Sequence, residues 1–344
     1  MSYLEDHREL LVALFDALGK DADWSDDPEV LVSHTLPRWL GTEHGSVGSK
    51  EHFTPAQIEA ARPILAELGL TRRIEPSADT YDEIVVLGAA GIGLHRRLEL
   101  VRTSQVSAAQ LTVLAGMRPH VGAAGSGRDG RIGELLAADG RFAAAPGWHP
   151  PVGLVHRARL LLEVGVDEDL AAQILLPSET DLARLLLTKQ WPELRCTQIV
   201  PACDAEPEPS PELGHREVLR YEWAGPPHLP QVQVLNGAPV ARPHGPARPT
   251  TASTLEEWIE QLPSDPDPRR VLFVVNQPHL GRVSLVLDEI LGPVDAPTVQ
   301  VEIAGCETLP NVGIHLLLGE IPARIAAEKR RKERADAGST PGLS

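Results

Sequence analysis

A histidine and an arginine three residues apart, His279 and Arg282, are the side chains of this sequence best placed for chemistry. They follow the apolar run of residues 270–275, and Asn276 comes directly after that run. If a buried strand ends there and a helix begins, the two side chains share one helix face. Such a pair could bind an anion, or His279 could transfer a proton while Arg282 holds charge. We therefore predict a site for an anionic small molecule, with His279 as a catalytic residue and Asn276 and Arg282 as ligand-binding residues.

A glycine-rich stretch follows another apolar run, residues 83–87. Gly88, Ala89 and Gly91 lie in a G-x-x-G-x-G spacing, which differs from the dinucleotide fingerprint G-x-G-x-x-G. Two interpretations stay open: a tight strand-to-helix turn, or a turn whose free N–H groups receive an anion. Arg97 stands just inside the predicted helix and could reach back to a phosphate or carboxylate.

Gly116 and Glu179 add two positions to the predicted site, one at the end of a predicted strand and one at the start of a predicted helix. Gly116 ends the apolar run of residues 110–115. Glu179 stands at a predicted helix start, where it could complement the helix dipole or act as a second proton-transferring residue. No residue pattern in the sequence requires a bound metal ion, although Glu179 or Asp181 could bind Mg²⁺ if the protein acts on phosphates.

Thr251 and Thr254 are the last predicted ligand-binding residues. They flank Ser253, which together with Glu256 has the spacing of a helix capping box. A cap needs one hydroxyl, so the additional hydroxyls of the threonines are available for a ligand.

The elements that position these residues alternate along the chain. Continuous apolar runs separated by helical segments are typical of a sheet buried on both faces. The sequence therefore predicts an α/β fold with an open, mostly parallel sheet and helices on both faces. In such a sheet ligands bind beyond the carboxyl ends of the strands. Predicted strands cover residues 83–87, 110–115, 270–275 and 298–303, with weaker candidates at 197–200 and 231–235.

Residues 1–75 predict an N-terminal helical region. Residues 6–18 carry an apolar stripe at helical spacing. Thr54, Pro55 and Gln57 form a helix-start signal with a capping box, and Gly69 is the expected stop.

The remaining chain divides into a large domain and a tail. We expect an α/β domain over residues 76–322, with insertions at about 119–176 and 201–249 that are rich in turn residues. Residues 323–344 predict a charged helix end and a flexible tail.

The amino-acid composition limits the classes of partner that this protein is expected to bind. The formal net charge of -16 argues against nucleic acid, because a phosphate-binding groove needs a basic surface. The chain has no apolar run near the roughly 18 residues of a membrane span and no signal-peptide pattern at its start. We expect a cytoplasmic protein without a membrane partner, and the sequence leaves its oligomeric state open.

In their order along the chain, several of these segments resemble the YdcF/SanA-like family, which also includes the envelope factor ElyC. The resemblance covers roughly half the chain, over residues 82–118, 177–190 and 249–305. It implies a Rossmann-like three-layer fold whose pocket is lined by the matching residues. The segments that carry it are the run 84–88, Arg97 with Leu98, the run 113–116, Glu179, the turn 251–254, and His279 with Arg282.

The sequence also departs from the family pattern. Glu257 stands where the family often has Asn, and Asn276 where it often has Ser or Thr. The helical region and both insertions are additional, and the membrane anchor of the envelope members is absent. Members of the family have been linked to S-adenosylmethionine binding and to envelope processes, so S-adenosylmethionine is a candidate cofactor by resemblance.

Three functions stay open at this point. The first is an enzyme that acts on a nucleotide-like or phosphorylated small molecule by hydrolysis or group transfer. The second is an S-adenosylmethionine-binding protein or methyltransferase. The third is a non-catalytic module that senses a ligand or binds a partner.

Overall fold

The computed structural model describes residues 3–20, 53–89, 91–116, 179–201, 219–237, 251–262, 267–291, 299–308 and 312–338. Contacts divide the chain into two compact units. The first unit comprises Met1–Ile74, Val275–Pro293 and Gly305–Ser344, and the second comprises Glu75–Val274 and Val294–Ala304. The first unit thus joins the N-terminal segment to parts of the chain that the sequence analysis assigned to the α/β domain and to the tail.

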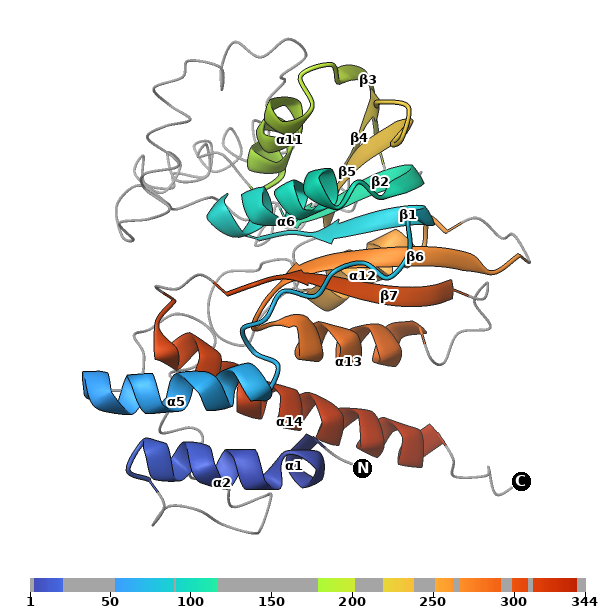
Figure 1. Cartoon of the computed structure of the whole chain (residues 1–344). Coiled ribbons are helices and arrows are strands. Elements are labelled where there is room, and N and C mark those ends of the chain that lie inside the picture. The colour runs from blue at the N-terminus through green and yellow to red at the C-terminus, as the bar shows by residue number, and fades with distance from the viewer. Residues whose placement is uncertain are drawn as a thin grey trace, which may run out of the picture. The chain divides into compact units, whose positions relative to one another are not determined.

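An open sheet of seven strands, in the order β3-β4-β5-β2-β1-β6-β7, organises the second unit (Figure 1). Strand β1 pairs in parallel with β2 and β6, and β2 pairs in parallel with β5. Strand β4 pairs antiparallel with β3 and β5. The predicted open, mostly parallel sheet is therefore confirmed. The strands are β1 (Thr80–Leu87), β2 (Ser107–Gly116), β3 (Arg195–Pro201), β4 (Leu219–Ala224), β5 (Gln231–Gly237), β6 (Arg269–Asn276) and β7 (Val299–Cys306).

Helices cover both faces of this sheet, which makes the fold a three-layer, Rossmann-like α/β arrangement. Helix α6 (Gly91–Ser104) connects β1 to β2, and helix α12 (Thr251–Ile259) lies between β5 and β6 in the chain. These two connections run in opposite directions along the sheet. Right-handed crossovers then place the two helices on opposite faces (Figure 1). Helix α11 (Glu179–Gln190) packs against α6, β2 and β5.

The strands form where the apolar runs predict them. The burial pattern of β1 is continuous from Glu83 to Leu87, and that of β6 from Val271 to Val275. Side chains of both orientations are buried there because helices cover both faces. The weaker candidate runs lie inside β3 and β5, whereas β4 was not predicted as a separate strand.

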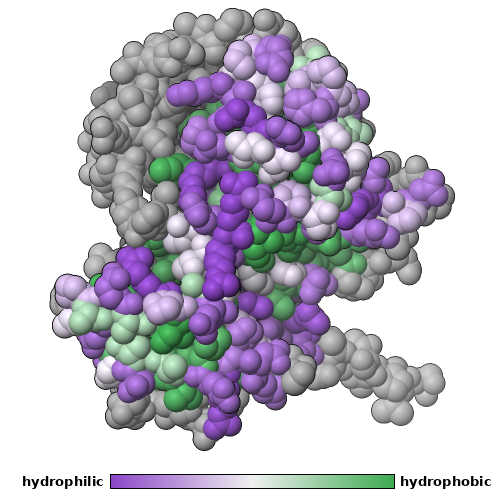
Figure 2. Space-filling model, in the orientation of Figure 1, coloured by the Kyte–Doolittle hydropathy of each residue, from purple (hydrophilic) through white to green (hydrophobic). Residues whose placement is uncertain are grey.

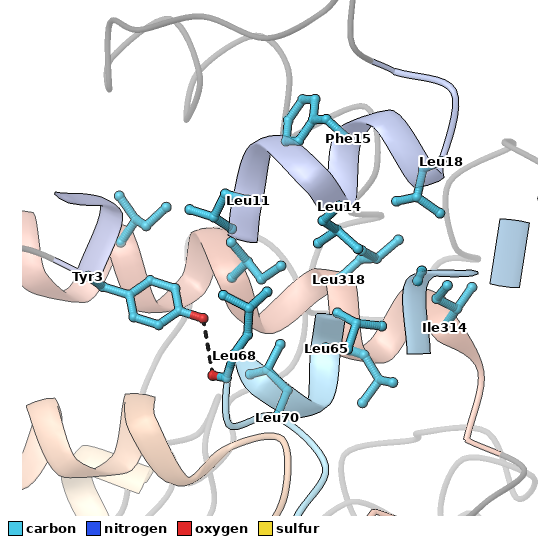
Figure 3. Packing of buried hydrophobic residues seen from close by; sticks show 14 residues of the cluster. Tyr3, Leu11, Leu14, Phe15, Leu18, Leu65, Leu68, Leu70, Ile314 and Leu318 are labelled. Carbon is cyan, nitrogen blue, oxygen red and sulfur yellow. Dashed lines mark hydrogen bonds between the residues drawn. The ribbon is translucent and has the colours of Figure 1, made fainter. Parts of the chain in front are cut away.

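The described part of the first unit is helical. Its elements are α1 (Tyr3–Asp6), α2 (Arg8–Ala17), α5 (Pro55–Glu67), α13 (Leu280–Leu291) and α14 (Ile314–Gly338). Helices α1, α2, α5 and α14 surround one apolar core (Figure 3). The predicted N-terminal helical extension is therefore present. The core is formed by Tyr3, Leu11, Leu14, Phe15, Leu18, Ala61, Leu65, Leu68, Leu70, Ile314, Leu317, Leu318, Ile321 and Ile325.

Helix α5 begins with the predicted capping box. The Thr54 hydroxyl accepts a hydrogen bond from the Gln57 backbone N–H, and the Gln57 side chain accepts one from the Thr54 N–H at 2.9 Å. The amide of Gln57 also donates to the carbonyl of Leu18 at 2.8 Å, which ties α5 to the end of α2. The helix stops before Gly69, which has a φ of 75°.

One local prediction needs correction, and one helix begins earlier than the sequence indicates. Helix α12 begins at Thr251, so Ser253 lies inside its first turn, is buried, and does not cap the helix. Helix α14 begins at Ile314, well before the charged helix end expected from residue 323, and contains Pro322. The apolar positions Ile314, Leu318 and Ile321 face the core, and this burial stabilises a helix that an internal proline disfavours locally.

The expected insertion at 119–176 lies outside the described residues, as does much of 201–249. None of the described helices has the length and apolar content needed to cross a bilayer. Hydrophilic residues predominate on the face drawn in Figure 2, with smaller hydrophobic areas between them.

Candidate active site

The turn between β6 and α13 positions His279. The backbone N–H of His279 donates to the carbonyl of Asn276 at 3.0 Å. The carbonyl of His279 accepts from the N–H of Val283 at 3.0 Å and so makes the first hydrogen bond of α13. His279 therefore has a fixed backbone at the helix start, and Arg282 lies in the first turn.

Glu320 of α14 binds both of these residues. Its Oε1 accepts a hydrogen bond from Nδ1 of His279 at 2.5 Å, since a carboxylate can only accept. Nε and Nη2 of Arg282 donate to the two oxygens of Glu320, each at 3.2 Å. The structure thus brings His279 and Arg282 together, with Nη2 of Arg282 lying 3.4 Å from Nδ1 of His279.

The charge of Glu320 is stabilised by its two neighbours. Burial by itself raises the pKa of this carboxyl, which is only 6% exposed. The hydrogen bond and charge of His279 and the charge of Arg282 outweigh that effect and leave the pKa below its ordinary value. Glu320 is therefore ionised at neutral pH.

An ionised Glu320 fixes the tautomer of a neutral His279. Because Nδ1 carries the proton donated to the carboxylate, Nε2 has the free lone pair. Nε2 makes no hydrogen bond with any residue that the structure describes, and the side chain of His279 is 32% exposed. A carboxylate-oriented imidazole on a partly exposed side chain has the geometry of a general base.

Two amide oxygens next to this pair have no hydrogen-bond donor among the described residues. Oδ1 of Asn276 and Oε1 of Gln277 are buried and accept no hydrogen bond from the described residues. The Gln277 amide nitrogen, in contrast, donates to the carbonyl of Arg72 at 3.1 Å. Buried polar atoms are normally satisfied, so an acceptor such as Asn276 Oδ1 suits a donor group on a ligand.

The glycine stretch after β1 is constrained by close packing. A Cβ at Gly88 would lie 2.5 Å from the carbonyl oxygen of Leu114, so no side chain fits there. Nη1 of Arg97 donates to the carbonyls of Leu87 and Gly88, the second at 2.8 Å. Arg97 is buried, and these bonds make it a residue that positions the carboxyl end of β1. Ala89 is half-buried, and Gly91 is the first residue of α6.

Glu179 and Gly116 lie at neighbouring strand and helix ends. The hydroxyl of Thr180, next to the buried Glu179, donates to the carbonyl of Gly116 at 3.2 Å. This bond ties the start of α11 to the end of β2.

The threonines of α12 also have structural contacts. The hydroxyl of Thr254 donates to the carbonyl of Thr251 at 3.0 Å, and its methyl group packs against Gly237 of β5. The predicted site residues consequently fall into two groups. Asn276, His279 and Arg282 belong to the first unit, and the others belong to the second.

Glu320 is the main residue of the site that the sequence analysis missed. It lies 41 positions from His279, so no local spacing links the two. The available signal was an acidic residue beside the apolar stripe of α14, next to Ile321.

A second polar cluster, around Glu83 of β1, was also missed. Oε1 of this buried carboxyl accepts hydrogen bonds from Gln110 at 3.0 Å, from the Trp258 indole at 3.1 Å, and from the Thr112 hydroxyl. Arg269 lies 3.4 Å from Oε2. Burial is the largest influence and raises the pKa of Glu83, and the donors and Arg269 offset it only in part.

Among the described residues, no group of three or more His, Cys, Asp or Glu side chains could hold a metal ion. Comparison of the chain with protein-family models, curated proteins and solved structures finds no match. The resemblance to the YdcF/SanA-like family continues to rest on the residues quoted for it.

Proposed function

We propose that this protein is an enzyme that acts on a nucleotide-like or phosphorylated small molecule by hydrolysis or group transfer, with His279 as the general base. The observation that carries the proposal is the Glu320–His279 pair. A buried, ionised carboxylate holds Nδ1 of the imidazole, and Nε2 is left to take a proton.

In the hydrolysis of a phosphate ester, Nε2 of His279 removes a proton from water as the water oxygen attacks phosphorus. The bond from phosphorus to the leaving oxygen breaks, and that oxygen departs with the electron pair. The imidazolium then returns the proton to the leaving group. Glu320 stabilises the imidazolium throughout, and Arg282 supplies positive charge beside it. In group transfer, a hydroxyl of the acceptor replaces the water.

The second unit supplies further support. Strand order changes direction beside β1, since the connection from β1 leads to β2 on one side while β6 leads to β7 on the other. Open α/β sheets bind ligands beyond the carboxyl ends of strands at such a point. We assign the backbone N–H groups of Gly88, Ala89 and Gly91 to the binding of an anionic group within the second unit, with Arg97 holding this stretch in place.

The test is turnover by wild-type protein and by His279→Gln on a panel of sugar phosphates, nucleoside phosphates, pyrophosphate compounds and S-adenosylmethionine. We expect phosphate release with at least one phosphorylated compound. His279→Gln should lower kcat by about 10² to 10⁴-fold, the usual contribution of a general base, with little change in KM.

The control for this test is His228→Gln, which removes an exposed histidine from the turn between β4 and β5. It should leave kcat unchanged. A His279→Gln protein that is folded and as active as His228→Gln would exclude His279 as the base. Methyl transfer without phosphate release would favour the S-adenosylmethionine alternative.

A further inference from the structure

Arg324 is a half-buried cation of α14 that pairs with no carboxylate among the described residues. It makes no ion pair or hydrogen bond with a described residue, and its Nε is buried without a partner. Its guanidinium lies over the ring of Tyr3, with Cζ 4.0 Å from the ring centroid. A buried guanidinium nitrogen without an acceptor is costly, so an anionic ligand group that accepts from Arg324 would be favourable here.

The acidic residues closest to Arg324 along α14 form hydrogen bonds with other residues. Glu320, one turn before it, is shared by His279 and Arg282. Glu328, one turn after it, accepts a hydrogen bond from the backbone N–H of Tyr3 at 2.9 Å. Neither carboxylate forms a salt bridge with Arg324 in the described part of the chain.

The guanidinium of Arg324 lies against the first turn of α13, within the candidate active site. A Cβ at Gly281 would be 2.7 Å from Nη1 and 2.9 Å from Cζ of Arg324. Gly281 stands between His279 and Arg282, so the absence of a side chain there admits a second guanidinium beside the Glu320–His279 pair. A cation at the amino-terminal turn of a helix is electrostatically unfavourable unless an anion accompanies it.

We infer that Arg324 and Arg282 together form a binding subsite for a phosphate group of the ligand. The cluster around Gly281 holds two guanidinium groups and one ionised carboxylate, so it has a net positive charge even when His279 is neutral. Guanidinium groups bind phosphate through paired, charge-assisted hydrogen bonds. Arg324 is thus a specificity-determining residue that selects phosphorylated ligands. The inference rests on the proposed function, because it assigns a substrate group to the same site.

The test is titration calorimetry with inorganic phosphate on the full chain, at ionic strength held constant with chloride. Arg324→Met removes the charge while keeping an apolar stem over Tyr3, and Arg324→Lys keeps the charge. Arg331→Met is the matched control, since it removes a charge from an exposed arginine of the same helix that pairs with Asp288. Melting curves of all variants establish that they are folded.

We expect saturable phosphate binding by the wild type and the Arg331→Met control. Arg324→Met should bind at least about tenfold more weakly, the loss of one charge-assisted hydrogen bond. Arg324→Lys should recover part of the affinity. A wild type that binds no phosphate, or an Arg324→Met protein with the affinity of the control, overturns the inference.

The outcomes also separate this inference from the proposed function. Arg324-dependent phosphate binding without His279-dependent turnover would retain the subsite and reject the enzyme. Turnover that depends on His279 but not on Arg324, with unchanged phosphate affinity in Arg324→Met, would retain the enzyme and reject the subsite.

Discussion

Glu320 is buried, yet two groups beside it favour its charged form. The hydrogen bond from His279 and the charge of Arg282 hold its pKa below the ordinary value of 4.5. The same carboxylate therefore orients the proposed base and stabilises the fold of the first unit. Loss of its charge should affect catalysis and stability together.

This coupling predicts an acid-dependent loss of stability. The pKa of Glu320 is lower in the folded protein than in the unfolded chain. Its favourable contribution is therefore complete above the unfolded value and declines as pH falls through the folded value. Glu320→Gln should cost about 3 kcal/mol at pH 7, because it removes the buried carboxylate charge that pairs with Arg282 and His279.

The measurement is denaturant unfolding followed by circular dichroism between pH 3 and pH 7. The difference in unfolding free energy between wild type and Glu320→Gln should shrink as the pH is lowered. A difference that is constant over this range would mean that Glu320 does not titrate as proposed.

At the scale of elements, one carboxyl anchors a helix to the sheet of the second unit. Glu83 of β1 accepts from the indole of Trp258 in α12, and it also joins Gln110 and Thr112 of β2. Trp258 is buried and meets Phe273 of β6 edge to face. The position of α12 therefore depends on a polar contact within an otherwise apolar layer.

Removing this anchor should destabilise the second unit. Glu83→Ala leaves the donors of Gln110, Thr112 and Trp258 without an acceptor and should cost about 2 to 4 kcal/mol. Glu83→Gln keeps an acceptor and should cost less at neutral pH.

The pH response of Glu83 has the opposite sign to that of Glu320. Burial raises its pKa above the ordinary value of 4.5, so its favourable contribution is complete below that value and is lost as pH rises toward the folded value. The unfolding free energy of Glu83→Gln, measured as a function of pH, should therefore lack this pH-dependent contribution. Equal pH profiles for the wild type and Glu83→Gln would contradict the assignment.

At the scale of the whole molecule, the first unit is assembled from three separate stretches of the chain. The N-terminal helices contribute Tyr3, Leu11, Leu14, Phe15 and Leu18 to its core. Figure 3 shows Leu14 beside Leu318 of α14, and the hydroxyl of Tyr3 donating to the carbonyl of Leu68 at the end of α5. The helix that carries Glu320 and Arg324 consequently depends on residues at the other end of the sequence.

Deletion of residues 1–20 should therefore abolish the compact first unit. Burial of a large apolar side chain is worth about 1.5 to 3 kcal/mol, and five such side chains are removed at once. We expect binding of a hydrophobic dye, rapid proteolysis of α14, and loss of phosphate binding. Val12→Ser, at a side chain that is already 40% exposed, is the control and should melt like the wild type. A truncated protein that melts like the wild type would show that α14 does not need the N-terminal helices.

Local patterns in the sequence were sufficient for most of the elements, with β4 and the start of α14 as exceptions. The capping box of Thr54 and Gln57 involves residues three apart, and the apolar runs of β1 and β6 reflect burial on both faces, so both can be read along the chain. The proximity of His279 and Arg282 follows in the same way from helical spacing.

Tertiary structure alone decided which groups these elements bring together. Glu320 reaches His279 across 41 positions, and Trp258 reaches Glu83 across 175. Neither distance has a periodicity that a sequence could reveal. The same holds for α14, where core packing stabilises a helix through Pro322. A carboxylate acquires a role from the residues that surround it after folding, because its pKa and its hydrogen-bond partners depend on contacts that no local pattern specifies.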